Sequence, residues 1–354
     1  MVLGILTSQI KIYGSRKDIR KMATMPRGRI VGTGSTAPKK ILSNVDLEGI
    51  VDTNNEWIVR RSGIEERRIS SKYLNETTTD LATQASRNAL DMASISPDKL
   101  DMIVAGTVTP DRQFPSAACM VQESLDAKNA AAFDVSAGCS GFLYALSMAN
   151  NAIQCGTCKT ALVLGVERLS TILDWEDRGT CVLLGDGAGA VVLTAEKGNN
   201  GILSTHLKSD GSLGDLLYSS EGKKSLPEIL GCVEQKSFHL KMEGNRLFKR
   251  AINCLTSIAR EALTHNAMSA ADIDSMIPHQ ANLRIIQATA KNLKIPMDKV
   301  YTNIHRYGNT SSASIPLAMD EANRDGHLAT GANVLLVSFG AGLTWGSSLL
   351  KWAL

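Results

Sequence analysis

The stretch Asp134-Val-Ser-Ala-Gly-Cys-Ser-Gly-Phe-Leu-Tyr-Ala-Leu146 joins a buried strand to an apolar helix through small residues, and this junction indicates an α/β fold. Small residues let the backbone turn sharply, as in nucleophile elbows. The turn puts Cys139 at the helix start, where the helix dipole stabilises a thiolate, the reactive form of cysteine. A cysteine in another setting is more often an inert buried thiol. Its position therefore makes Cys139 the candidate nucleophile.

Strands and helices alternate on both sides of this stretch. Short apolar runs separated by helical patterns predict buried strands at 29–32, 101–105, 131–135, 160–166 and 190–194. Such an alternation is typical of an α/β layered protein.

A weak internal repeat relates segments that lie about 170 residues apart. Ser96 and Ser269 each precede an acidic turn and a short strand. Segments 131–135 and 299–303 each enter a turn of small residues and then a helix. The repeat also predicts that strand pairs close both halves, 161–165 with 187–193 and 333–338 with 343–352.

This repeat predicts two duplicated α/β halves, 26–198 and 199–354. The preceding residues 1–25 are expected to be a loosely ordered extension, and Met22 and Met25 are alternative starts of the functional chain. The duplication sets Cys139 and Asn309 in corresponding turns, from which they can face each other across the junction.

Composition excludes several classes of protein. The chain has 354 residues, of which 44% are hydrophobic and 21% charged, as in folded enzymes. The net charge of +3 is spread along the chain, so nucleic acid is not expected as the main partner. Seven cysteines form no disulfide framework, which favours a reducing, cytoplasmic location. No apolar run approaches the roughly 20 residues of a membrane span, so no membrane partner is expected.

Two further segments carry polar residues at the ends of strands. His279 lies in Met276-Ile-Pro-His-Gln-Ala-Asn-Leu-Arg-Ile-Ile286, after a short strand and before a helix that Asn282 can cap. Asn309 lies in Tyr307-Gly-Asn-Thr-Ser-Ser-Ala-Ser-Ile-Pro316, where small residues let a ligand approach the backbone. The Asn309 amide can donate to an oxyanion, and helix capping is the alternative for it. His305, four residues earlier, stays a second candidate.

Other motifs point to chemistry with less support. Gly32-Thr-Gly34 and Asp186-Gly-Ala-Gly189 lack the spacing of a dinucleotide site, so close packing of strands is the better interpretation. Cys155-Gly-Thr-Cys158 has redox or zinc spacing but no second ligand pair, and we treat it as chance.

Five more segments carry a resemblance to a known family. They are Asn55-Glu-Trp-Ile-Val-Arg-Arg-Ser-Gly-Ile-Glu-Glu-Arg-Arg68, Phe114-Pro-Ser-Ala-Ala-Cys119, Asp177-Arg-Gly-Thr180, Gly185-Asp-Gly-Ala-Gly-Ala190 and Phe339-Gly-Ala-Gly-Leu-Thr-Trp-Gly-Ser347. With the three segments above, they make the chain, from about residue 29 to 354, resemble the ketoacyl-acyl carrier protein synthase III family, the thiolase-fold enzymes that start fatty acid synthesis. The resemblance implies duplicated α/β halves in a five-layered αβαβα sandwich.

The resemblance also implies a ping-pong reaction without a metal or redox cofactor. Cys139 takes an acyl group, acetyl as the expected primer, from acyl-CoA. Malonyl-acyl carrier protein then loses carbon dioxide, and its enolate attacks the acyl thioester to give a 3-oxoacyl-carrier protein. His279, as a neutral imidazole, and Asn309 would stabilise the malonyl oxyanion, and the backbone amides of Cys139 and Ala341 the acyl oxyanion.

Residues that would hold CoA follow from the same resemblance. They are Trp57, stacked on the adenine, and, near the pantetheine and phosphate groups, Arg61, Asn245 and Arg284. Family members often carry a second stacking arginine where this chain is expected to have Thr171, and Trp175 is the expected substitute.

Contacts with protein partners are implied as well. A basic patch for the acidic acyl carrier protein comprises Lys249, Arg250, Arg284 and Lys291, with solvated helix faces as the alternative. Phe114 would reach across a homodimer interface to bound the partner's acyl pocket, with ordinary core packing as the alternative.

Two other functions remain open at this point. Another thiolase-fold condensing enzyme, such as a hydroxymethylglutaryl-CoA synthase or a synthase of polyketide or quinolone pathways, would share the cysteine and histidine. A non-catalytic acyl-CoA binding or scaffold protein would keep the fold without turnover. The joint presence of Cys139, His279 and Asn309 argues against the second.

Overall fold

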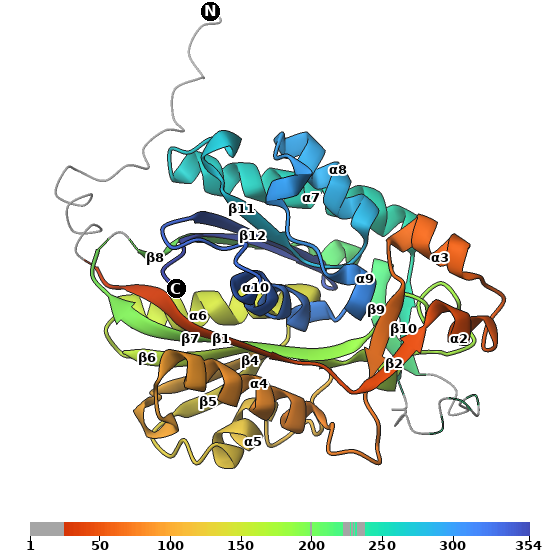
Figure 1. Ribbon diagram of the computed structural model, residues 1–354, viewed down its shortest axis with the longest axis horizontal. Helices are drawn as coiled ribbons and strands as arrows, with labels where there is room; N and C mark the ends of the chain where they lie inside the picture. The colour runs from red at the N-terminus through yellow and green to blue at the C-terminus, as the bar shows by residue number, and fades with distance from the viewer. Residues whose placement is uncertain (1–24, 199, 222–226, 228, 230, 232–237) are drawn as a thin grey trace, which may run out of the picture.

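The computed structural model describes residues 25–198, 200–221, 227, 229, 231 and 238–354, and two sheets organise this part of the chain (Figure 1). The first sheet has the order β1-β7-β6-β4-β5 and consists of β1 (Arg27–Thr36), β4 (Met102–Gly106), β5 (Ala131–Val135), β6 (Thr160–Arg168) and β7 (Asp186–Glu196). β4 is parallel to β5 and β6, and β7 is antiparallel to β6 and β1. The five predicted strands and the pairing of 161–165 with 187–193 are confirmed.

The second sheet belongs to the C-terminal part of the chain. Its order is β11-β12-β13-β8, from β8 (Gly201–Ser209), β11 (Ser275–Pro278), β12 (Asn333–Gly340) and β13 (Thr344–Lys351). The predicted pairing of 333–338 with 343–352 is confirmed as an antiparallel ladder. Segment 299–303, which the repeat matches to β5, forms no strand and contributes an isolated bridge between Met276 and Val300.

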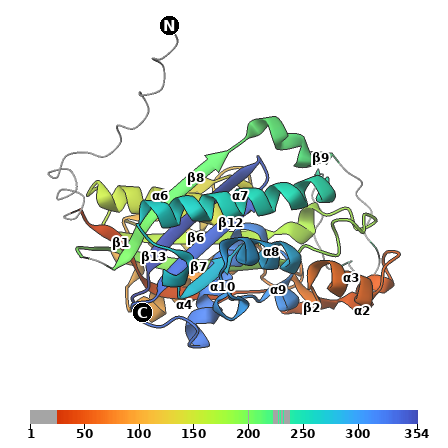
Figure 2. The same ribbon diagram turned by 90° about the horizontal axis from the view of Figure 1, so that it is seen from above.

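Helices lie outside and between the sheets in five layers (Figures 1 and 2). α4 (Thr78–Ala93) and α5 (Ala117–Ser124) pack on the outer face of the first sheet. α6 (Gly141–Gln154) and α10 (Ser314–Arg324) lie between the sheets, and α7 (Gly244–His265) and α8 (Leu283–Leu293) cover the second sheet. This is the predicted αβαβα sandwich.

The sequence of α6 explains why it occupies the central layer. Phe142, Leu143, Leu146 and Ile153 are all buried in one core cluster with residues of both sheets. A helix that is apolar over most of its surface must be covered by neighbours on more than one side, and only positions such as Met148 and Asn151 of α6 are exposed. Burying each such large side chain contributes about 1.5–3 kcal/mol.

Two glycines of β1 allow the first outer layer to pack closely. A Cβ atom on Gly32 would lie 2.3 Å from the Ala89 carbonyl oxygen, and one on Gly34 would lie 2.3 Å from that of Ala85. Both carbonyls belong to α4, so these glycines serve close packing, as predicted, but the strand packs against a helix and not against another strand.

Smaller elements gather at one end of the sandwich, on the right of Figure 1. They are the β2 (Lys40–Ser43) and β3 (Glu66–Ile69) ribbon, the β9 (Leu217–Glu221) and β10 (Phe238–Met242) ribbon, α2 (Asn44–Glu48), α3 (Asn55–Ser62) and α9 (Ile304–Tyr307). Neither ribbon was predicted from the sequence.

The expected boundary between halves falls between β7 and β8, yet core residues of both sheets form one cluster around the central helices. The division at 198 and 199 therefore stays a prediction. Residues 1–24 of the expected N-terminal extension lie outside the described residues. Within the described residues, no helix combines the length and apolar character needed to cross a membrane.

Candidate active site

Cys139 lies in the short connection between β5 and the central helix α6. The 3-10 turn Gly138–Ser140 leads directly into α6, and Gly138 adopts a φ of 52°, which favours glycine. The turn packs on the end of β12, where a Cβ atom on Gly340 would lie 2.4 Å from the Cys139 backbone nitrogen. The predicted elbow follows a strand of the first sheet, and its backbone packs closely against the end of a strand of the second sheet.

The thiol of Cys139 is not ionised by its position. Burial raises its pKa to about 11, and the charge of Glu167 acts in the same direction. A hydrogen bond with the Ser311 side chain and the backbone amides of Cys139 and Ala341 favour the thiolate but do not compensate. The expectation that the helix start ionises the thiol is wrong, because desolvation raises its pKa more than the helix terminus and the hydrogen bonds lower it.

His279 follows β11 and lies almost completely buried. Its backbone nitrogen donates to the Val337 carbonyl oxygen at 2.8 Å, and its Nδ1 atom lies 2.7 Å from the Ser314 hydroxyl. Burial lowers the pKa of the imidazole to about 3. His279 is thus neutral at physiological pH, as expected, and Asn282 caps the following helix by accepting from the Arg284 amide.

Asn309 is held in one orientation by its surroundings. Its backbone nitrogen donates to the Leu183 carbonyl oxygen at 2.8 Å, and its Oδ1 atom accepts from the Ser311 amide at 2.8 Å. Within the described part of the chain, its NH2 group has no hydrogen-bond acceptor. The side-chain oxygen thus caps the turn by accepting a hydrogen bond, as in the capping alternative. The NH2 group stays available to a ligand.

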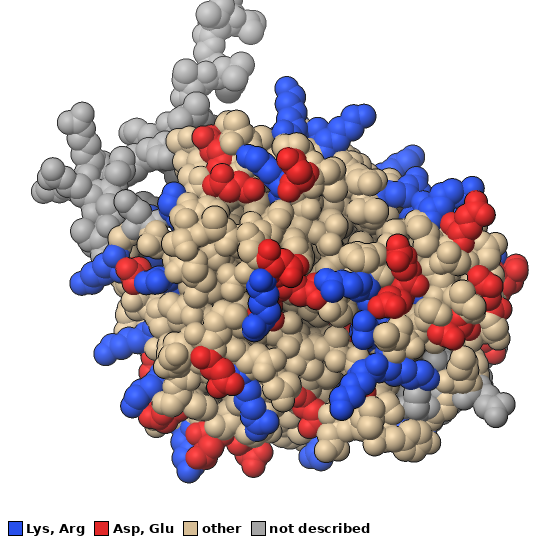
Figure 3. Space-filling view, viewed as in Figure 1, with Lys and Arg blue, Asp and Glu red and all other residues tan. Residues whose placement is uncertain are grey.

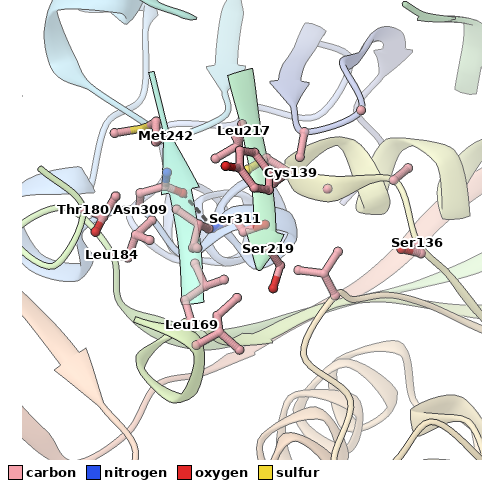
Figure 4. Close-up of a pocket in the computed structure, with 18 of the residues that line it drawn as sticks. Ser136, Cys139, Leu169, Thr180, Leu184, Leu217, Ser219, Met242, Asn309 and Ser311 are labelled. Carbon is pink, nitrogen blue, oxygen red and sulfur yellow. Dashed lines mark hydrogen bonds between the residues drawn. The ribbon is translucent and has the colours of Figure 1, made fainter. Parts of the chain in front are cut away.

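Two cavities meet at these residues. One of about 660 Å³ has apolar walls, and Figure 4 shows Cys139, Asn309 and Ser311 together with Leu169 and Leu184 along it. The other, of about 640 Å³, is lined by His279 as well as Cys139 and Asn309. Residues that line both are Cys139, Leu183, Leu217, Met242 and Asn309. The structure therefore brings the three sequence candidates to one junction.

The cavity that contains His279 also includes every expected CoA residue. Those residues are Trp57, Arg61, Asn245 and Arg284. The guanidinium carbon of Arg61 lies 5.2 Å from the Trp57 ring centroid. These groups provide an aromatic face and two cations along one path to Cys139.

The expectations about Thr171 and Trp175 are wrong. Thr171 is buried and donates to the Arg168 carbonyl oxygen at 2.7 Å, while Trp175 is only 1% exposed, so neither can reach a nucleotide. Arg178 instead lies with its guanidinium carbon 5.3 Å from the Trp57 centroid and lines the same cavity. The signal was present in the segment Asp177-Arg-Gly-Thr180, but the arginine was sought at the wrong position.

The four expected docking cations differ in their surroundings. Lys249 and Arg284 line the cavity, while Arg250 forms an ion pair with Asp210 at 3.1 Å. Lys291 is exposed farther along α8 and does not line the cavity. In Figure 3, Lys and Arg side chains gather in the part of the view where α3 adjoins α7 and α8.

Phe114 is 84% exposed and does not line either cavity, although Arg112 and Gln113 line the apolar one. Core packing within the single chain is therefore excluded. His305 is exposed on α9 and lies outside both cavities.

The remaining motif is the pair Cys155 and Cys158. Both thiols are free, with Cys155 exposed and Cys158 buried. Among the residues that the structure describes, no group of His, Cys, Asp or Glu side chains is arranged to hold a metal ion.

Sequence reasoning missed Glu167 and Ser311. Glu167 is buried at the end of β6 and accepts a hydrogen bond from the hydroxyl of Ser311, a residue that lines the apolar cavity together with Cys139. Nothing local to Glu167 in the sequence predicted this, because its partners come from distant segments.

Known proteins resemble the chain over most of its length. Residues 133–211 match the family described as 3-Oxoacyl-[acyl-carrier-protein (ACP)] synthase III, and residues 263–352 match its C-terminal part. The Beta-ketoacyl-[acyl-carrier-protein] synthase III of Caldanaerobacter subterraneus subsp. tengcongensis is 50% identical over 324 residues, covering 92% of this chain and 97% of the relative. That of Xanthomonas campestris pv. campestris is 51% identical over 326 residues, covering 92% and 98%.

A solved structure agrees with these sequence matches. The crystal structure of 3-oxoacyl-[acyl-carrier-protein] synthase III from Aquifex aeolicus superposes with a TM-score of 0.84 at 47% identity. The superposition covers 92% of this chain and 100% of the other.

Proposed function

The chain belongs to the 3-oxoacyl-[acyl-carrier-protein] synthase III family, and from that premise we propose how its own residues perform the reaction. It is a condensing acyltransferase that initiates fatty acid synthesis. An acyl-CoA primer and malonyl-acyl carrier protein give a 3-oxoacyl-carrier protein, carbon dioxide and CoA through an acyl-enzyme intermediate.

Cys139 is the proposed nucleophile of the first half-reaction. Its sulfur attacks the thioester carbonyl of acyl-CoA, and CoA leaves. The backbone amides of Cys139 and Ala341 are placed to donate hydrogen bonds at the sulfur, and both lower the pKa of the thiol. Two such amides can hold the oxyanion that develops on the acyl carbonyl.

His279 and Asn309 are the proposed donors of the second half-reaction. Decarboxylation of the malonyl group places negative charge on the thioester oxygen, and the Asn309 NH2 group is available to donate to it. In His279, a Ser314 hydroxyl that donates to Nδ1 leaves the ring proton on Nε2. A neutral ring donates this proton in a hydrogen bond and does not pair with the malonyl carboxylate as a cation would.

The cavity that contains His279 is the proposed path for both thioesters. Trp57 and Arg178 offer an aromatic face and a guanidinium for the adenine, in place of the expected Thr171 position. Arg61, Asn245 and Arg284 lie farther along the same cavity, where pantetheine and phosphate groups would run. In this proposal the reaction needs no cofactor, because all reacting and stabilising groups belong to the chain or to its substrates.

The acyl carrier protein is the proposed protein partner. Lys249 and Arg284 support this, because two exposed cations at the cavity mouth suit an acidic partner that must insert its thioester. Arg250 on α7 and Lys291 on α8 extend this patch. Arg250 also forms an ion pair with Asp210.

A homodimer is proposed as the working assembly. An aromatic side chain that is 84% exposed beside residues of the apolar cavity supports contact with a second copy. In this arrangement Phe114 closes the apolar cavity of the partner, which holds the acyl group. Acetyl is the proposed primer, and the cavity of about 660 Å³ offers room for longer chains.

We propose a cytoplasmic location for the enzyme. The six described cysteines are free, as expected for a reducing compartment.

One observation carries the function: Cys139, His279 and Asn309 line a single cavity. The experiment is intact-mass analysis after brief incubation with mixed acyl-CoAs, followed by malonyl-acyl carrier protein or malonyl-CoA. We expect an acyl adduct on Cys139, with the added mass identifying the primer, and product only with the carrier protein. Preference for malonyl-CoA would favour another condensing enzyme, and no adduct would favour a scaffold.

A further inference from the structure

Glu167 is a buried carboxylate that the proposed mechanism does not use. It lies on β6, close to the end of the strand, and is inaccessible to solvent. Its neighbour Arg168 is directed elsewhere, with its guanidinium 3.5 Å from Asp111 and 2.9 Å from the Ser70 hydroxyl. A buried carboxylate is costly unless hydrogen bonds surround it, so its partners indicate what it holds in place.

Neutral donors from two distant segments bind Glu167. One oxygen accepts from the Thr109 hydroxyl at 2.6 Å and the Val108 amide at 3.1 Å. The other accepts from the Ser312 hydroxyl at 2.9 Å and the Ser311 hydroxyl at 3.2 Å. An ionised carboxylate has acceptors on both oxygens and no donor of its own, so it can hold both segments at once.

Ser311 links this carboxylate to the side chain of Asn309. Its hydroxyl donates to Glu167, while its backbone amide donates to the Asn309 Oδ1 atom at 2.8 Å. Figure 4 shows this second bond at the wall of the apolar cavity. The φ of Ser311 is 50°, a left-handed conformation that costs free energy in a residue with a side chain. The bond to Glu167 is therefore suited to hold the Ser311 amide in place.

The backbone and the side chain of Asn309 are held by separate contacts. The backbone nitrogen donates to the Leu183 carbonyl oxygen at 2.8 Å, and the carbonyl oxygen accepts from the Gly185 amide at 3.0 Å. Neither contact fixes the terminal amide, which can rotate between two orientations. With Oδ1 on the Ser311 amide, the NH2 group is left for a ligand. In the reversed orientation the oxygen would face the ligand and repel an oxyanion.

We propose that Glu167 is a positioning residue for decarboxylation, which acts by holding Ser311 so that the Asn309 NH2 group meets the malonyl thioester oxygen. Ser311 is a second positioning residue, because it joins the carboxylate to the amide. The proposal rests on the proposed function, in which Asn309 donates to that oxygen.

The charge of Glu167 also points to the second half-reaction. Burial is the main cause of the raised pKa of the Cys139 thiol, and the charge of Glu167 raises this pKa further. The carboxylate thus disfavours the thiolate that attacks acyl-CoA. Its contribution to the reaction therefore lies in the step that uses Asn309.

The experiment measures decarboxylation of malonyl-acyl carrier protein by the Cys139→Ala enzyme, through release of labelled carbon dioxide. This background has no thiol, so any influence of Ser311 or Glu167 on the sulfur drops out. Ser311→Ala keeps the amide that bonds to Asn309 and removes the hydroxyl that bonds to Glu167. Glu167→Gln keeps the size of the side chain but leaves an acceptor oxygen on one side only.

Each added substitution should lower kcat for decarboxylation about tenfold and leave KM unchanged, because a displaced donor is lost mainly in the transition state. In the enzyme that carries both Cys139→Ala and Asn309→Ala, the same substitutions should change kcat less than about twofold, since the amide that they position is gone. A general loss of structure would instead lower the rate in both backgrounds.

Ser312→Ala is the matched control. The Ser312 hydroxyl bonds to Glu167 and to the Gly106 carbonyl oxygen and not to Asn309, so its removal weakens the same turn without freeing Ser311. It should leave kcat for decarboxylation within about twofold. Circular dichroism checks folding, and Ser311→Ala decides alone if Glu167→Gln does not fold.

A loss of decarboxylation that disappears without Asn309 supports the proposal. Equal losses in both backgrounds, no loss in Ser311→Ala, or the same loss in Ser312→Ala overturn it. If Asn309→Ala leaves decarboxylation unchanged, or if the Cys139→Ala enzyme does not decarboxylate, the proposed function is refuted instead.

Discussion

The turns that lead into the two central helices have the same geometry but carry different chemistry. The turn Gly138–Ser140 before α6 begins with a residue whose φ is 52°, and the turn Ser311–Ala313 before α10 begins with one whose φ is 50°. Cys139 in the first turn thus corresponds to Ser312 in the second. The duplication predicted from the sequence is visible here at the level of backbone angles.

The two corresponding side chains have opposite surroundings. Cys139 lines both cavities, whereas the Ser312 hydroxyl is buried and shares its one proton between the Gly106 carbonyl oxygen and Glu167. The second half instead presents His279 and Asn309 to the same junction. A repeated backbone therefore supplies a nucleophile from one half and oxyanion donors from the other.

Removing the nucleophile should have the largest effect. Cys139→Ala is expected to lower condensation by about 10³-fold or more, because no acyl-enzyme can form. Decarboxylation of the malonyl thioester should persist, since its donors belong to the second half. Product assays and carbon dioxide release measure the two activities separately, and loss of both would contradict the division of labour.

Removing a hydrogen-bond donor of the second half should impair condensation but leave acylation of Cys139 intact. His279→Ala and Asn309→Ala are each expected to lower condensation by about 10²–10³-fold, as for other oxyanion donors. Both should still form the acyl adduct on Cys139 in intact-mass spectra. An adduct missing from either variant would place that residue in the first half-reaction.

The contact between the halves can be tested at Gly138. A Cβ atom there would lie 2.7 Å from the Ala341 nitrogen, while Gly156, with φ of 76°, has open space around it. Gly138→Ala should lower the free energy of unfolding by about 1–3 kcal/mol more than Gly156→Ala, because both add backbone strain but only one adds a clash. Equal losses in urea unfolding would show that the turn is not tightly packed.

The two halves should also differ in how pH affects stability. The pKa of His279 is lowered to about 3, so the unfolded chain binds more protons below about pH 6.5, and stability falls with falling pH by about 1.4 kcal/mol per unit. The pKa of Cys139 is raised to about 11, so its contribution is lost as pH rises from 9. Melting curves should show a shallower acid limb in His279→Gln and a shallower alkaline limb in Cys139→Ser. Unchanged limbs would mean that neither group titrates differently on folding.

Charge reversals on the outer helices should have the smallest effect on activity. Lys249→Glu and Arg284→Glu, on the helices that cover the second sheet, should raise KM for malonyl-acyl carrier protein about three- to tenfold by repelling an acidic partner. Lys128→Glu, an exposed cation in the first half, is the matched control and should leave KM unchanged. Steady-state kinetics at low salt measure this, and equal KM values in all variants would exclude the patch.

The sequence predicted the fold well because its signals are local. Strands such as β4 and β5 are short apolar runs, and most residues of α6 are apolar, so their burial follows from the amino acids themselves. The segment 299–303 resembled β5 in pattern but lacks the pairing that would complete a fifth strand of the second sheet. Pairing depends on partners that a local pattern does not contain.

Prediction of the active-site residues also depended on whether their signals are local in the sequence. Cys139, His279 and Asn309 could be found because each follows a strand and precedes a helix. Arg178 was misplaced, because which residue reaches the Trp57 ring depends on the path of its loop.

The layered α/β architecture, the repeat and the three central polar residues could be inferred from the sequence alone, because periodicity and strand-to-helix turns are properties of neighbouring residues. The ionisation of Cys139 and the partners of Glu167 became clear only in the folded chain. Desolvation and hydrogen bonding depend on groups that are distant in the chain, such as Ser311 and Thr109, and these meet only when both sheets close around the central helices.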